Sequence, residues 1–243
     1  MHRVLAVAQA VVSDAIRRRI VWVVALFALV LAGAIPMLPS YGVGVEGAVY
    51  REIALAMTYV AAMVVALVLS VARIPTEIER RTLYSALARE VRRWEYVFGT
   101  WLGIFITLGA VMIAFGAVIF GVGWPVYHEP MWQLWEGVLA IWLEAGVIAA
   151  FCVAVSTVSV PAVVSVAALA FLFVTHVRTG LLGGPENPMW HFYPSLDAFN
   201  IIAPVAHGSG VSLAYLRSMV AVFVGWAGAL VILGALGFAR RDL

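Results

Sequence analysis

Long apolar stretches restrict this chain to one kind of fold. Each carries almost no charge, and together they cover residues 20–38, 53–73, 96–120, 135–158, 161–178 and 215–238. About 20 helical residues cross the ~30 Å hydrocarbon layer of a bilayer. Lipid offers no partners for backbone N–H and C=O groups, so spans this apolar are helices. The sequence therefore predicts an all-α polytopic membrane protein, a single transmembrane domain over residues 1–243 with six transmembrane helices.

The first 19 residues have a different pattern. Apolar side chains fall close to one helical face, and three arginines, Arg17 to Arg19, follow it. This pattern favours an interfacial elbow helix over residues 1–19 that lies on the membrane surface before the chain enters the bilayer. A secretory signal peptide is the competing interpretation, because Ala32-Gly33-Ala34 is typical of a cleavage site.

The placement of arginine predicts the orientation of the spans. If the N-terminus is cytoplasmic, the outer side holds only Arg51, Arg178 and Arg217 of the 15 arginines. The opposite orientation would reverse that ratio, and positively charged loops stay inside. We therefore expect both termini to be cytoplasmic, residues 74–95 to form a cytoplasmic segment, and residues 179–214 to form an extracytoplasmic connection.

The cytoplasmic segment is unusually rich in charge for a chain that is 12% charged overall. Thr76 followed by Glu79 has the spacing of a capping box, which predicts a helix starting at Thr76. The mixture of Glu and Arg along an apolar stripe indicates one or two amphipathic helices. Two interpretations stay open: a solvated loop whose arginines set topology and contact membrane lipid, and a surface that docks a partner protein.

Two residue types limit the chemistry of the chain. None of the 15 basic residues is a lysine, so the chain has neither a P-loop lysine for ATP phosphates nor a Schiff-base lysine. The single cysteine, Cys152, excludes a disulfide within the chain and a thiolate metal cluster. We expect no cofactor in this chain and no nucleic-acid partner.

The stretch Glu77–Gly103 resembles the first cytoplasmic loop of type-2 ATP-binding-cassette permeases. That loop often carries two acidic residues, Gly-Thr-Leu, a leucine pair, Pro-x-Ser-Arg, an aromatic residue and Gly-Lys. The matching residues are Glu79, Thr82, Leu83, Leu87, Arg93, Tyr96 and Gly99. Arg81, Glu90 and Thr100 replace the Gly, Pro and Lys of the pattern. The elbow, the six spans and the long last outer connection extend the resemblance to the whole chain.

The resemblance implies an exporter permease in a bacterial or archaeal cytoplasmic membrane. Such permeases form homo- or heterodimers and pair with separate ATPase subunits, which hold ATP and Mg; this chain is then not itself an enzyme. Residues 74–95 would contain the coupling helix. Its ATPase-docking residues would be Glu77, Glu79, Arg80, Arg81, Thr82 and Leu83. A related alternative is a membrane subunit that transmits ATPase motion to another protein without transport. An amphipathic substrate, such as a lipid or peptide, is preferred because the spans lack a charged lining.

One polar pair is predicted inside the membrane. Glu144 and His176 each lie about 16 residues from the turn near 159–161, on adjacent antiparallel spans, so both sit roughly 24 Å from that turn. Ionisable residues at such depth are functional or paired. A substrate or proton role and a structural pair are both open.

Three further patterns suggest other sites. "HGSG" at 207–210 suggests an intramembrane serine hydrolase that uses Ser209, although no histidine is placed to act as its base. His191, Asp197 and His207 have no recognisable metal-ligand spacing. Gly99-x-x-x-Gly103 predicts close helix packing, with a dimer interface as an alternative use.

Overall fold

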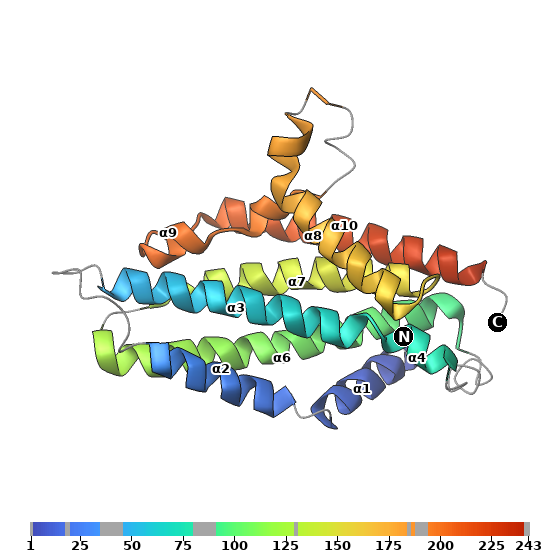
Figure 1. Cartoon of the computed structure of the whole chain (residues 1–243), viewed down its shortest axis with the longest axis horizontal. Helices are drawn as coiled ribbons and strands as arrows, with labels where there is room; N and C mark the ends of the chain where they lie inside the picture. Colours follow the sequence, from blue (N-terminus) through green and yellow to red (C-terminus); the bar gives the residue numbers. More distant parts are fainter. Residues whose placement is uncertain are drawn as a thin grey trace.

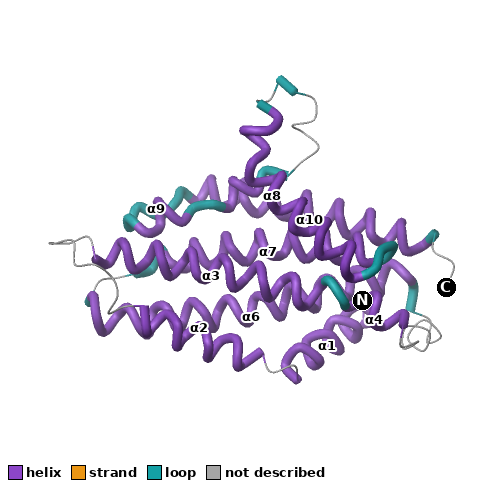
Figure 2. The backbone as a smooth tube through the Cα atoms, in the orientation of Figure 1, coloured by secondary structure: helices purple, strands orange, loops and turns teal. Residues whose placement is uncertain are grey.

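Figures 1 and 2 show the computed structural model of the chain, whose described residues form helices joined by turns and loops, with no strand among them. The described residues are 2–17, 20–34, 46–79, 91–128, 131–183, 186–187 and 194–240. The longer helices are α1 (His2–Arg17), α2 (Ile20–Ala34), α3 (Glu46–Ser70), α6 (Arg93–Tyr127), α7 (Leu134–Ser156), α8 (Pro161–Leu182) and α10 (Leu213–Ala239). Short helices are α4 (Arg73–Glu79), the 3-10 helix η3 (Leu196–Phe199) and α9 (Ile202–Ala206).

Four of these helical segments are long and apolar enough to cross a membrane. They are Glu46–Glu79, Arg93–Tyr127, Leu134–Ser156 and Leu213–Ala239. The apolar parts of α2 and α8 are shorter, at Val24–Gly33 and Pro161–Val177. The all-helical membrane fold is thus supported, while the crossings of α2 and α8, and with them the count of six spans, stay predictions.

The start of α1 and the end of α10 lie toward the same end of the bundle as α4 (Figure 1). We call the end formed by α1, α4, the start of α6 and the end of α10 the α4 end, and the opposite end, next to α9, the α9 end. Helix α7 is the most enclosed of the four segments long enough to cross a membrane. In its most apolar stretch of 18 residues 72% is buried, against 33% for α10. It packs against α3, α6, α8 and α10. Any polar side chain on the inner face of α7 therefore needs a partner within the protein.

Helix α1 lies along α6, and two glycines make that contact possible. A Cβ atom at Gly103 would lie 2.8 Å from the carbonyl oxygen of Ala8 and 2.7 Å from Cβ of Val11. At Gly99 it would lie 2.9 Å from the carbonyl oxygen of Val4. The Gly99-x-x-x-Gly103 pattern therefore packs two helices of the same chain closely, and these glycines are covered by α1 rather than open to a second copy.

Substituting Gly103 by alanine is expected to lower stability by about 1–3 kcal/mol, because the added methyl meets the backbone of α1 and forces it away. The matched control is Gly121→Ala on the same helix, where nothing lies within 4 Å of the added Cβ. That change should be neutral or stabilising by about 0.5–1 kcal/mol, since alanine favours helix over glycine. Thermal unfolding of both variants in detergent micelles checks the difference. Equal melting temperatures would contradict the close packing of α1.

The predicted helix start at Thr76 is wrong. Helix α4 begins at Arg73, and the amide of Thr76 already bonds to the carbonyl of Ala72 at 3.0 Å. Helix α4 starts earlier because it follows α3 after a turn of only two residues. Pro75 is tolerated there because residues in the first turn of a helix do not need their N–H groups for helix hydrogen bonds.

A carboxylate does cap a later helix. At the start of α6, Glu95 Oε2 accepts a hydrogen bond from the amide of Arg92 at 2.8 Å.

Candidate functional sites

The structure describes two of the six residues predicted to dock an ATPase. Glu77 and Glu79 lie on α4, whereas Arg80, Arg81, Thr82 and Leu83 lie outside the described residues. The two glutamates differ in surroundings. Glu79 is exposed at the last position of α4, and Glu77 is part-buried against the bundle. Of the described pair, Glu79 is therefore the one that faces outward.

Glu77 belongs to an ionic network at the α4 end. Arg73 stands between two carboxylates, with Nη1 2.5 Å from Asp14 Oδ2 and Nε 2.8 Å from Glu77 Oε1. The hydroxyl of Tyr96 donates to the other oxygen of Glu77. These four residues come from α1, α4 and α6, so the network joins three elements. We refer to Asp14, Arg73, Glu77 and Tyr96 as the α4-end network.

The end of α10 also contacts the α4-end network. The Tyr96 ring stacks on that of Phe238, with centroids 6.1 Å apart and ring planes 28° apart. Arg93, one turn earlier on α6, donates to the carbonyls of Phe238 and Ala239 at 3.1 and 3.0 Å. These carbonyls lie at the end of α10, where the regular bonds of a helix run out; the Phe238 carbonyl also accepts from the amide of Arg240. Part of the charge in the predicted segment 74–95 therefore serves contacts inside the chain.

The second polar site is buried among α3, α7 and α8. Glu144 Oε1 lies 3.2 Å from His176 Nε2 and accepts a hydrogen bond from the hydroxyl of Tyr59 at 3.1 Å. The same hydroxyl lies 3.2 Å from His176 Nε2. The side chain of Glu144 is only 2% exposed, and that of His176 is 26% exposed. The structure thus brings Glu144 and His176 together, as predicted, and adds Tyr59, which no pattern in the sequence indicated.

The hydrogen bonds around His176 determine where one proton lies. Nδ1 is 3.0 Å from the carbonyl of Leu172, which can only accept, so Nδ1 carries a hydrogen. His176 Nε2 and Glu144 Oε1 can form a hydrogen bond only if one of the two atoms carries a proton. That proton can be on either atom. In both arrangements the pair has no net charge. This neutrality makes it compatible with a span from which water is excluded.

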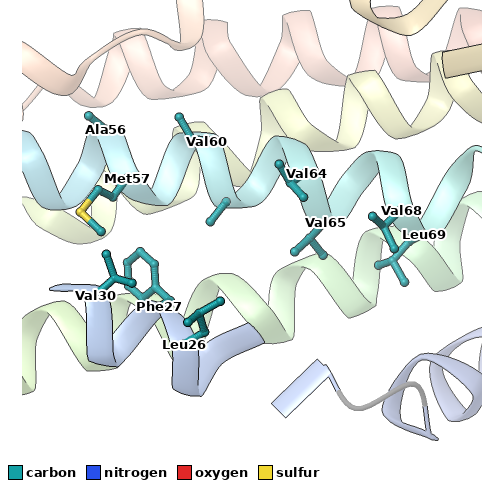
Figure 3. A pocket seen from close by; sticks show the side chains of 11 residues that line it. Leu26, Phe27, Val30, Ala56, Met57, Val60, Val64, Val65, Val68 and Leu69 are labelled. Carbon is teal, nitrogen blue, oxygen red and sulfur yellow. The ribbon is translucent and has the colours of Figure 1, made fainter. Parts of the chain in front are cut away.

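An apolar groove of about 610 Å³ runs between α2 and α3 (Figure 3). Its lining is entirely apolar and consists of Leu26, Phe27, Val30, Ala56, Met57, Val60, Ala61, Val64, Val65, Val68 and Leu69. Such a surface can contact hydrocarbon chains and has no side chain that would bind a charged group. It is the surface expected for helices that face lipid.

The hydrolase pattern at 207–210 does not form a catalytic arrangement. Gly208 and Gly210 have positive φ values of 74° and 61°, which only glycine adopts readily. The amide of Val211 donates to Glu136 Oε2 at 2.8 Å, so this carboxylate anchors the turn to α7. Among the described residues, no hydrogen bond joins Ser209 to a histidine. The turn is a structural connection between α9 and α10.

The structure describes two of the three residues considered as metal ligands. His191 lies outside the described residues, Asp197 lies on η3, and His207 follows α9. In the described part of the chain, no group of three His, Cys, Asp or Glu side chains could hold a metal ion.

Comparison with known proteins identifies the family. A family model described as "ABC-2 family transporter protein" matches residues 5–243. The chain belongs to this family. No curated protein matches the sequence. As an ABC-2 family member the chain is a transmembrane permease of an ABC transporter, which confirms the resemblance seen in Glu77–Gly103.

Membership of the ABC-2 family is consistent with a chain that has no lysine. Permeases of this family work with an ATP-binding-cassette ATPase subunit and are not themselves catalytic. A permease therefore needs no P-loop lysine of its own. The α4-end network and the Glu144–His176 pair are then features of a membrane subunit, one near the predicted ATPase contact and one within the spans.

Proposed function

We propose that this chain is the permease subunit of an ATP-binding-cassette exporter, working as a dimer with a second copy or a paralogue. The family match over residues 5–243 carries the proposal. The arginine distribution supports placing the α4 end in the cytoplasm. With that orientation, α4 leads directly from a membrane-spanning helix into the segment predicted to meet the ATPase.

The docking surface is proposed to begin at Glu79 and to continue through Arg80 to Leu83. Glu79 is exposed and ends α4, so a partner has access to it. Adjacent acidic and basic side chains suit a protein groove of mixed charge better than an anionic lipid surface, which would repel the carboxylates. The substrate is proposed to be amphipathic, because the described spans present apolar surface to the membrane and no charged lining.

The partner can be tested by purification. We expect the chain purified alone to hydrolyse no ATP, and co-expression with its cognate ATPase subunit to yield a stable complex that does. Robust hydrolysis by the lone chain, with a preparation free of contaminating ATPase, would remove the proposal. Failure of any ATP-binding-cassette ATPase encoded alongside it to co-purify would also count against it.

A further inference from the structure

The α4-end network differs from a docking surface, because its groups already have partners within the chain. Both carboxylate oxygens of Glu77 are engaged, one by Arg73 Nε and the other by the Tyr96 hydroxyl. Arg73 is likewise shared between Asp14 and Glu77, and its side chain is only 15% exposed. An ATPase that used Glu77 as a docking contact would have to break these internal contacts first.

The base of α4 is also anchored by apolar packing. Ile74 and Pro75 are buried, and α4 packs against α7 as well as α3. A short helix fixed at its base moves with the helices that hold it. Displacement of α4 would therefore be passed to α1 through Asp14 and to α6 through Tyr96.

The connection extends to α10. Tyr96 packs on Phe238, and Arg93 binds the final carbonyls of α10. A single tyrosine thus contacts the carboxylate of α4 through its hydroxyl and the end of α10 through its ring.

We infer that the α4-end network transmits ATPase motion into the membrane helices, with Glu77 and Tyr96 as positioning residues that do not touch the ATPase. The inference rests on the proposed function, since it needs an ATPase partner. It divides the acidic residues of α4 by role: Glu79 contacts the partner, and Glu77 couples α4 to α1, α6 and α10.

The test removes one hydroxyl and leaves the ring. Tyr96→Phe retains the packing on Phe238 and loses only the hydrogen bond to Glu77, and Asp14→Asn is a second variant that weakens the link to α1. Tyr215→Phe is the matched control, because its hydroxyl donates to the Ala198 carbonyl at the other end of α10. Spin labels at positions 46 and 213, both exposed at the α9 end, report ATP-induced distance changes in a Cys152→Ser background.

We expect Tyr96→Phe and Asp14→Asn to co-purify with the ATPase as the wild type does and to hydrolyse ATP within about twofold of it. The fraction of molecules that changes distance on ATP addition should fall at least fivefold in Tyr96→Phe and be unchanged in Tyr215→Phe. A wild-type distance change in Tyr96→Phe overturns the inference. Loss of co-purification also overturns it, because the residue would then belong to the docking surface. If the wild-type chain itself forms no ATPase complex, the proposed function fails, and the inference with it.

Discussion

Replacing His176 by leucine is expected to destabilise the protein by about 3–5 kcal/mol. The change leaves the carboxyl group of Glu144 buried without the imidazole that shares its proton, and removing one member of a buried pair costs about that much. Tyr59 can still donate to Glu144, but its hydroxyl does not replace the hydrogen bond between Glu144 and His176 Nε2. Equilibrium unfolding in detergent micelles measures the loss.

The double variant Glu144→Gln/His176→Leu separates charge from packing. It removes both ionisable groups and leaves an amide oxygen to accept from Tyr59, so most of the stability should return, since replacing a whole buried pair is often close to neutral. His207→Leu, at an exposed position outside the cluster, is the control and should have no effect. A double variant less stable than His176→Leu would contradict the pairing.

The same double variant also distinguishes the two roles proposed for the pair. If Glu144 and His176 only stabilise the fold, the stable double variant keeps the ATP-induced distance change and substrate-stimulated ATP hydrolysis. If they handle a proton or a substrate group, the double variant folds and docks but loses the substrate response.

Reversing the charge of Glu79 is expected to weaken ATPase co-purification by more than tenfold. Disrupting a desolvated interfacial charge pair costs about 2–5 kcal/mol, and 1.4 kcal/mol already corresponds to tenfold in affinity. Glu52→Lys is the matched control, because Glu52 is also exposed but lies on α3 toward the α9 end. Insertion and folding should be unaffected in both variants, as judged by yield and melting temperature.

If the segment is only a solvated loop that contacts membrane lipid, we expect a different result. There, Glu79→Lys would be silent or would strengthen membrane contact, and loss of an exposed arginine would matter instead. Arg92→Ala tests this, because Arg92 is exposed. Arg93 is unsuitable because it binds the end of α10, so its removal disturbs packing as well as charge. If Glu79→Lys co-purifies like the wild type, the docking proposal fails and the solvated-loop interpretation stands.

The sequence predicted those features that depend on spacing along single helices. Apolar length located the four helical segments that are long enough to cross a membrane. Counting residues from the turn near 159–161 placed Glu144 and His176 at equal depth, where the structure has them in contact. The same counting could not find Tyr59, because its position relative to α7 depends on how α3 packs. Nothing in its neighbourhood distinguishes it from an interfacial or core tyrosine.

Prediction was weakest where elements far apart in the chain meet. The Thr76 capping box was wrong because α4 continues from α3 rather than starting afresh. Asp14 pairs with Arg73 across 59 positions, and Arg93 binds the Phe238 carbonyl across 145. Local pattern carries no information on such contacts. The spacing of Gly99 and Gly103 predicted that another helix packs closely against them. Only the structure shows that this helix is α1.

The packing of α1 on Gly99 and Gly103 has a consequence for the order of events during synthesis. Helix α1 leaves the ribosome before α6, and its binding surface on α6 is made about 95 residues later, which at 5–20 residues per second is a delay of about 5–20 s. Until then its apolar residues Val4, Ala8, Val11 and Ala15, which are buried in the finished protein, have only the membrane surface to cover them. Insertion of α6 is therefore the event that allows α1 to reach its final place.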